Sequence, residues 1–280
     1  MMAYSVAEEM IQTIWSSLCD RGLGHLDRVH GYLFNMLDGR ATPENRPERE
    51  LFRHLYVPGL KPGPYFDSDD LLQLDSAAEL AAIQEEARSA FLQQALLTDH
   101  SDLVIGNAPA AQAGWNCLYF RKEFVDLDET NRLFPATSAY LRRHRLATEA
   151  LYSRLAPQTS IEPHSDCANY VATVHLPLAD SLASISVANE VKGYSAGKVI
   201  FFDSSFTHSV ENASAYPRDI LLFNVWHPQL SDDEVASLKL IRQLWGRSVA
   251  FDPDTGFSPG LLRENEANSD NVIETNAAFK

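Results

Sequence analysis

The spacing of apolar residues divides the chain into a helical beginning, a strand-rich middle and a further helix. Between residues 6 and 37 apolar side chains recur at helical intervals with a glycine-containing break, which predicts two amphipathic helices. Ser76 and Glu79 have the spacing of a capping box, so a helix is expected from there to about residue 97. A second capping box, at Ser231 and Glu234, predicts another helix after the strands.

Short runs of β-branched and aromatic residues, separated by turns, occupy the region between about residues 113 and 226. The runs are WNCLYF, EALYSRL, NYVATVHLPL, ASISVANEV, KVIFF and DILLFNVW. Because no helical pattern intervenes, they predict an antiparallel barrel or sandwich.

The remaining segments suggest how the chain is organised. Residues 39–75 are rich in proline, glycine and charge, which is typical of a long irregular connector, and residues 251–280 resemble a weakly ordered acidic tail. We therefore expect an N-terminal helical region with its connector at 1–57, a barrel domain with flanking helices at 58–250, and the tail at 251–280.

Composition and charge restrict the classes of partner. The chain has 280 residues, 45% of them hydrophobic, with 38 acidic against 23 basic side chains and a formal charge of −15. Such a surface repels phosphate backbones and anionic membranes, so neither nucleic acid nor a membrane is expected as a partner. The three cysteines form no CxxC pair and no signal or membrane-spanning segment is evident, which favours the cytoplasm. The oligomeric state is left open.

A pair of possible metal ligands stands in the segment EPHSD. On an extended strand, residues two apart point to the same side, so His164 and Asp166 can offer a nitrogen and an oxygen to one ion. His208 follows the apolar run KVIFF, where a later strand can return beside the first. Two histidines and a carboxylate leave positions open on an octahedral ion and suit Fe(II). The alternative is that Asp166 turns outward and caps the loop at Asn169.

Arg218 stands at the head of the strand RDILLFNVW. If its guanidinium is directed into the barrel, it requires a partner there, and its fork geometry suits the distal carboxylate of a dicarboxylic acid. The alternative is an arginine at the sheet edge that is exposed to water.

Three strings in the sequence resemble one known family. HSDCANYVATVHLPL (164–178), GKVIFFDSSFTHSVENASAYPRDILLFNVWHP (197–228) and PGLKPGPYFD (58–67) are similar to the aspartyl/asparaginyl β-hydroxylase family of Fe(II)- and 2-oxoglutarate-dependent oxygenases. The resemblance runs from about residue 58 to residue 234. It implies a mainly β fold, a double-stranded β-helix of the jelly-roll or cupin-like kind, with N-terminal and C-terminal helices packed outside.

The resemblance also implies roles for individual residues. His164 and His208 match the iron-binding histidines of the family, and Arg218 matches the arginine that pairs with the far carboxylate of 2-oxoglutarate. Ser153 matches a serine that helps to hold this cosubstrate, and His175 matches a histidine near its iron-side carboxylate. Alone, Ser153 could be a strand-edge hydroxyl, and His175 could be a core histidine that is bonded to a backbone carbonyl.

Three positions depart from the family pattern. Well-known members have glycine in place of Asp166 and bind iron through the two histidines and water. They tend to carry aspartate in place of Ser204 and a basic residue in place of Thr173. Since a carboxylate is gained beside the first histidine, we expect Asp166 to complete the set of ligands.

The expected function is that of an Fe(II)- and 2-oxoglutarate-dependent dioxygenase. It would hydroxylate an unactivated carbon of an amino-acid, peptide or peptide-like metabolite with dioxygen, and release succinate and CO2. The alternative is a cupin-like metal-binding protein that is non-catalytic or independent of 2-oxoglutarate.

The string GYSAG at 193–197 matches the nucleophile-elbow motif GxSxG of α/β-hydrolases. An elbow requires a helix after the serine, but here the sequence predicts a strand, so a hairpin turn is expected instead.

Overall fold

The described part of the chain forms two compact units in the computed structural model. It comprises residues 2–38, 48–49, 51, 55–67, 74–99, 104–105, 108–109, 114–166 and 168–246. The first unit contains the described residues within 1–42, 57–59 and 230–280, and the second those within 43–56 and 60–229. The expected tail at 251–280 lies outside the described residues, and the boundaries expected at residues 57 and 250 stay predictions.

The first unit is made of helices α1 (Met2–Asp20), α2 (Asp27–Asp38) and α6 (Asp232–Gly246). The two N-terminal helices and the helix after the strands therefore occur where the apolar spacing predicted them. Glu234 completes the second capping box, because its amide donates to the Ser231 hydroxyl at 3.2 Å and its carboxylate accepts from the Ser231 amide at 2.8 Å. The same carboxylate accepts two hydrogen bonds from Arg28 on α2, at 2.7 and 2.8 Å.

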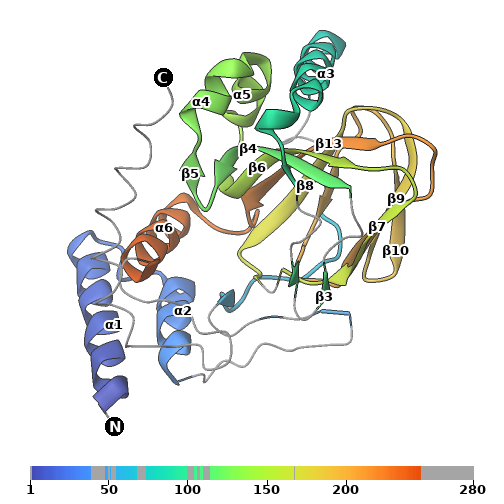
Figure 1. Ribbon diagram of the computed structural model, residues 1–280. Coiled ribbons are helices and arrows are strands. Elements are labelled where there is room, and N and C mark those ends of the chain that lie inside the picture. The colour runs from blue at the N-terminus through green and yellow to red at the C-terminus, as the bar shows by residue number, and fades with distance from the viewer. Residues whose placement is uncertain are drawn as a thin grey trace. The chain divides into compact units, whose positions relative to one another are not determined.

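The second unit is built on two antiparallel sheets (Figure 1). The larger has the order β1-β4-β6-β13-β8-β11, with β5 paired to β4, and the smaller has the order β10-β9-β12-β7. A separate pair joins β2 and β3. The strands are β1 Thr98–Asp99, β2 Val104–Ile105, β3 Ala108–Pro109, β4 Trp115–Lys122, β5 Val125–Asp126, β6 Leu146–Leu155, β7 Thr159–His164, β8 Val171–Pro177, β9 Ser181–Val187, β10 Glu190–Tyr194, β11 Ile200–Phe202, β12 His208–Asn212 and β13 Arg218–Trp226.

The order of these strands defines a double-stranded β-helix. Along the chain β6, β8, β11 and β13 belong to the larger sheet, whereas β7, β9, β10 and β12 belong to the smaller one. The chain thus crosses repeatedly between two sheets, and closing them on each other protects the edges, as in jelly rolls and cupins. The predicted mainly β fold is confirmed.

Alternating side chains give the larger sheet two buried faces. The inner face and the smaller sheet share one apolar cluster, which includes Leu155, Ile161, Ile185, Val187, Ile200, Phe202, Val210 and Ile220. On the outer face Tyr152, Val174 and Phe223 pack with Ile83 and Phe91 of helix α3 (Ala77–Leu92). Helices α4 (Asp128–Leu133) and α5 (Pro135–Leu141) follow β5 and complete this layer.

Two sequence expectations need correction. The helix expected to reach residue 97 ends at Leu92, because Gln93 leaves the helical conformation and a 3-10 turn follows at Gln94–Leu96. Helices α4 and α5 interrupt the run of strands in which no helix was expected. With six and seven residues, they are too short to show a helical period in the sequence.

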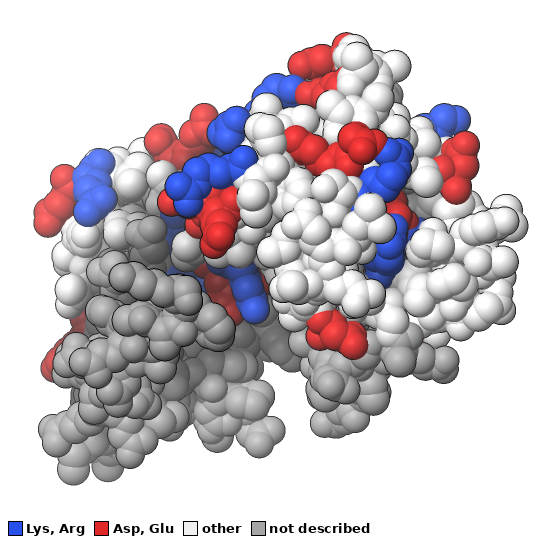
Figure 2. Space-filling model, turned by 45° about the horizontal axis from the view of Figure 1, so that its top comes forward, with Lys and Arg blue, Asp and Glu red and all other residues white. Residues whose placement is uncertain are grey.

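The described surface carries charges of both signs. Figure 2 shows Lys and Arg side chains interspersed with Asp and Glu on the face that it presents. Within the described residues, every helix is too short or too polar to traverse a lipid bilayer.

Candidate metal centre

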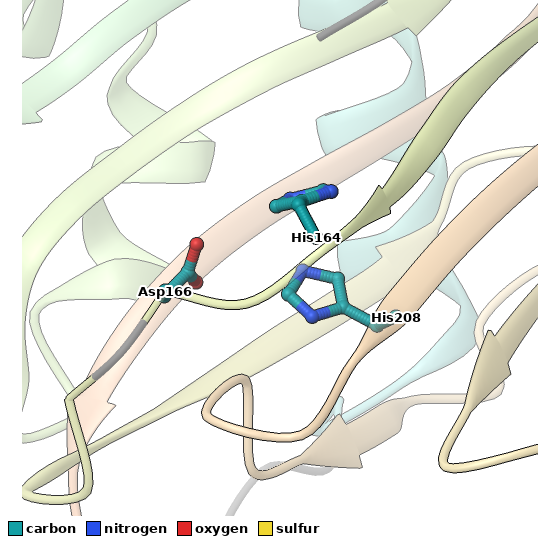
Figure 3. Close-up of side chains that lie close together, drawn as sticks. All are labelled: His164, Asp166 and His208. Atoms are coloured by element: carbon teal, nitrogen blue, oxygen red, sulfur yellow. The ribbon is translucent and has the colours of Figure 1, made fainter. Parts of the chain in front are cut away.

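Two histidines face each other where strands β7 and β12 pair. His164 is the last residue of β7 and His208 the first of β12, and the antiparallel register sets them directly opposite. Their ring centroids lie 4.2 Å apart (Figure 3). The pairing of two strands therefore brings together imidazoles that are far apart in the sequence.

Asp166 joins the two histidines from the loop that follows β7. One ligand atom from each of His164, Asp166 and His208 lies within 4.8 Å of the others. His208 is buried, His164 is half-buried and Asp166 is exposed, so the cluster is open on one side. In Figure 3 the carboxylate and both rings converge on one region at the end of the strands. Two nitrogen donors and one carboxylate on one face fit a mononuclear Fe(II) with positions left for other ligands.

Backbone carbonyls orient both rings. His164 Nδ1 lies 2.8 Å from the carbonyl of Glu162, and His208 Nδ1 lies 2.9 Å from that of Phe206. A carbonyl can only accept, so Nδ1 carries the hydrogen in each ring and Nε2 keeps its lone pair for a metal. Burial also lowers the pKa of His208, although the charge of Asp166 opposes this effect, and the lowered pKa favours the neutral ring that can act as a ligand.

The segment around Asp166 is fixed by the loop before His208. The amide of Asp166 donates to the carbonyl of Ser204 at 2.9 Å, and the Ser165 hydroxyl donates to the carbonyl of Ser205 at 2.8 Å. The Asn169 amide, which Asp166 could have capped, donates instead to the carbonyl of Leu55 at 3.3 Å.

Arg218 lies buried inside the barrel at the start of β13. It is 1% exposed, and its Nη2 donates to Ser153 Oγ on the adjacent strand β6 at 3.2 Å. Its Nε is buried without a hydrogen-bond partner among the described residues. No carboxylate of the described residues forms an ion pair with it, so the barrel interior holds a positive charge that an anion could neutralise.

The hydroxyl of Ser153 lies beside Arg218 and can also donate a hydrogen bond to such an anion. Its oxygen accepts from Arg218 and, at 3.0 Å, from the indole nitrogen of Trp115. These two bonds occupy the lone pairs of the hydroxyl, so its hydrogen can be donated to the Cys117 sulfur, with which Ser153 forms a side-chain hydrogen bond, or to a bound anion. The aromatic ring of Tyr194 covers the guanidinium of Arg218 at 5.5 Å. Trp115 and Tyr194 contact Ser153 and Arg218 but were not found in the sequence, since no local pattern marks them.

His175 lies deeper in the same interior. Its Nδ1 is 3.0 Å from the hydroxyl of Tyr194, and burial, reinforced by the charge of Arg218, holds its pKa well below the usual range. Two residues earlier, the Thr173 hydroxyl accepts from the Asn224 side chain at 3.0 Å. Asn224 in turn accepts from Thr148 at 2.6 Å. A neutral hydrogen-bonded chain thus occupies the position where the family pattern has a basic residue.

Further carboxyl groups lie in the electrostatic environment of the cluster. Burial, together with the negative charge of Asp166, raises the pKa of Glu149 to about 7. Burial also raises the pKa of Asp203, although hydrogen bonds from Ser205 and the charge of Arg49 oppose this effect. Neither residue was singled out from the sequence.

The GYSAG string at 193–197 lies in a turn that leads from β10 of the smaller sheet to β11 of the larger sheet, so the connection is not the hairpin that was expected. Strand β10 ends at Tyr194, the Lys198 amide donates to the Ser195 carbonyl at 3.0 Å, and strand β11 begins at Ile200. A nucleophile elbow requires a helix directly after the serine. The geometry therefore excludes an elbow at Ser195. Cys167, next to Asp166, lies outside the described residues.

The double-stranded β-helix with its His–Asp–His cluster and buried arginine defines a barrel protein of the jelly-roll and cupin class. Residues 77–228 match the family described as aspartyl/asparaginyl β-hydroxylase, which is more than half of the chain. The chain therefore belongs to the aspartyl/asparaginyl β-hydroxylase family, as the motifs predicted.

Individual relatives cover different parts of the chain. The aspartyl/asparaginyl β-hydroxylase of Homo sapiens is 39% identical over 93 residues, which is 32% of this chain and 12% of the human protein. Aspartate β-hydroxylase domain-containing protein 2 of Xenopus tropicalis is 25% identical over 216 residues, or 70% of this chain and 56% of that protein. A prolyl-4-hydroxylase structure from Pseudomonas putida aligns with a TM-score of 0.34 at 15% identity, covering 55% of this chain and 88% of that one.

Proposed function

We propose that this protein is an Fe(II)- and 2-oxoglutarate-dependent dioxygenase. It hydroxylates an unactivated carbon of an amino-acid, peptide or peptide-like metabolite and releases succinate and CO2. Membership of a hydroxylase family and the arrangement of the three possible ligands support the proposal.

The observation that carries the proposal is the state of Arg218. Burying a guanidinium that is 1% exposed, with an Nε that lacks a hydrogen-bond partner among the described residues, carries a large desolvation penalty. The attraction of a bound carboxylate would offset this penalty. Metal binding alone would not require such a group. A dicarboxylic cosubstrate would, because one carboxylate can reach the metal while the other meets the arginine.

Different residues of the chain would bind the metal and the cosubstrate. His164, Asp166 and His208 would hold Fe(II), and Arg218 with Ser153 would hold the distal carboxylate of 2-oxoglutarate. His175, kept neutral by burial, offers Nε2 to the iron-side end of the cosubstrate. When bound, Fe(II), 2-oxoglutarate and dioxygen supply the oxidation, in which one oxygen atom enters the substrate and the other enters succinate.

The inner faces of the sheets restrict access of water to this chemistry. Phe202 lies with its ring centroid 5.4 Å from that of His208 and 5.1 Å from that of His175, and so presents an apolar ring to both histidines. Ile220 and Leu155 line the barrel next to Arg218 and Ser153. An apolar wall of this kind strengthens the charge interactions inside it and excludes competing hydrolysis.

The decisive experiment is an anaerobic titration with Fe(II) and then 2-oxoglutarate. Bidentate chelation gives a visible metal-to-ligand charge-transfer band, which we expect in the unaltered protein. The band should be lost in His208→Ala and require much more 2-oxoglutarate in Arg218→Ala. Arg154→Ala is the matched control, because Arg154 stands next to Ser153 but stacks on Phe91 at the outer face.

Each result has a clear meaning. Bound iron without a band would contradict the assignment of 2-oxoglutarate and favour the cupin-like metal-binding alternative. A band with normal iron affinity in Asp166→Ala would show that the two histidines suffice. A band together with succinate formation that depends on an added amino acid or peptide would support the hydroxylase.

A further inference from the structure

The segment at Glu48–Arg49 lies against the loop that leads into the metal centre. Arg49 forms an antiparallel bridge with Phe206, and the Thr207 amide donates to the carbonyl of Glu48 at 2.8 Å. These two residues precede the family-matched region at 77–228. A part of the chain outside the family match therefore contacts the loop that precedes His208.

The side chain of Arg49 is buried within this loop, which we call the metal loop (residues 203–207). Its Nε donates to Ser205 Oγ at 2.8 Å, and its Nη2 lies 3.4 Å from the carboxylate of Asp203. Its guanidinium also lies 5.1 Å from the ring centroid of Phe206. Arg49 is 7% exposed and Asp203 is fully buried, so solvent screens their interaction little.

Asp203 transmits this contact to the backbone of the metal loop. Its Oδ1 accepts from the amide of Ser205 at 3.0 Å and from the Ser205 hydroxyl at 2.5 Å. The Ser205 hydroxyl thus receives the Arg49 bond and gives its own hydrogen to Asp203. Arginine, serine and aspartate form a closed triangle that defines the conformation of the loop.

The backbone of the same loop orients the proposed metal ligands. The carbonyls of Ser204 and Ser205 accept from the amide of Asp166 and the hydroxyl of Ser165, and the carbonyl of Phe206 accepts from the ring of His208. A rotation of the loop would therefore displace the carboxylate and the histidine together.

We propose that Arg49 is a positioning residue of the metal centre, which acts through Asp203 and Ser205 to hold the metal loop in the conformation that orients Asp166 and His208. The inference rests on the proposed function, since it assumes that these residues bind a metal. It assigns a role in metal binding to a segment that the family match does not include.

The test compares metal affinity in variants of the full chain. Arg49→Gln removes the charge and the fork, and we expect its dissociation constant for Mn(II), measured by electron paramagnetic resonance of the free ion, to rise about 10- to 100-fold. Arg49→Lys keeps the charge but cannot reach Ser205 and Asp203 together, so it should recover part of the affinity. The charge-transfer band with Fe(II) and 2-oxoglutarate should shift in Arg49→Gln.

Arg154→Gln is the matched control, because Arg154 forms a bidentate pair with Asp219 at 2.7 Å in the same barrel and its guanidinium lies over Phe91 at the outer face. It should lower the urea midpoint of the metal-free protein while metal affinity stays within about twofold. Equal affinity in Arg49→Gln and the unaltered protein would overturn the inference, as would an equal loss in Arg154→Gln.

If Arg49→Gln does not fold, the metal affinity of Ser205→Ala is measured and judged by the same criteria, because this variant breaks the triangle without removing a charge. Failure of the unaltered protein to bind metal would instead overturn the proposed function.

Discussion

Single residues determine what the barrel interior can bind. Arg218 and Ser153 present a charged fork and a hydroxyl group, whereas Thr173 and Asn224 present a neutral hydrogen-bonded chain. The proposed anion site therefore lies on the side of the interior that holds Arg218 and Ser153. The motif strings located Arg218 and Ser153, but only the folded chain shows that the guanidinium is buried and that no carboxylate in the described part of the chain pairs with it.

The Arg218→Met variant tests this description at the scale of one residue. We expect the affinity for 2-oxoglutarate in Mn(II)-loaded protein to fall by about 2–5 kcal/mol, because the bound carboxylate loses its charged partner. The ligand-free protein should unfold at the same temperature or higher, since an unpaired buried charge is replaced by an apolar chain. Titration calorimetry and a thermal melt measure the two effects. Unchanged affinity, or a strongly destabilised ligand-free protein, would contradict this role.

At the scale of elements, caps and registers fix how the helices and strands begin. Both predicted serine caps exist, since the amides of Glu79 and Glu234 each donate to the serine hydroxyl three residues earlier at 3.2 Å. The Glu234 carboxylate completes its box by accepting from the Ser231 amide, whereas the Glu79 carboxylate accepts from the amide of Asp75 at 2.8 Å. A cap depends on neighbours in the sequence, which is why local reasoning found it. The bidentate contact of Arg28 with Glu234 joins two helices that are separated by most of the chain, and no local pattern predicts it.

The Glu234→Gln variant tests the joint role of this side chain. Burial alone would raise the pKa of Glu234, but the hydrogen bonds from Arg28 and Ser231 outweigh burial and lower it. A lowered pKa means that the ionised form stabilises the fold above the ordinary carboxyl pKa and that this contribution is lost as the pH falls through the lowered value. We expect the variant to lose about 1–2 kcal/mol at pH 7 and to show a weaker loss of stability on acidification.

Urea unfolding between pH 3 and pH 7 measures this difference. Glu211→Gln, which removes an exposed charge from β12, is the control and should follow the unaltered protein. Identical pH profiles for Glu234→Gln and the unaltered protein would show that the contact with Arg28 contributes nothing.

At the scale of the whole molecule, buried neutral histidines couple folding to pH. Burial lowers the pKa of both His175 and His208 in the folded chain. Unfolding releases them to their ordinary pKa, so the unfolded chain takes up protons first as the pH falls below about 6.5. Their contribution to stability is therefore complete above that pH and is lost below it.

We expect the free energy of unfolding of metal-free protein to fall by up to about 1.4 kcal/mol per pH unit for each such histidine below pH 6.5. His175→Gln should show a shallower slope in urea unfolding between pH 5 and pH 7.5. Replacement of His25, which is exposed, should leave the slope unchanged. A slope that His175→Gln does not alter would show that this histidine is protonated in the folded state.

The sequence by itself determined the class of fold, the family and the residues that carry its motifs. The period of apolar residues, the capping boxes and short spacings such as His164 to Asp166 depend on neighbours in the sequence, so they can be recognised without a structure. Tertiary structure decided which side chains meet. The antiparallel register places His208 opposite His164, Trp115 and Tyr194 join Arg218 and Ser153 from separate strands, and Arg49 reaches the metal loop across more than 150 positions. Such contacts follow from strand pairing and closure of the barrel, which depend on the packing of the whole chain rather than on any one segment.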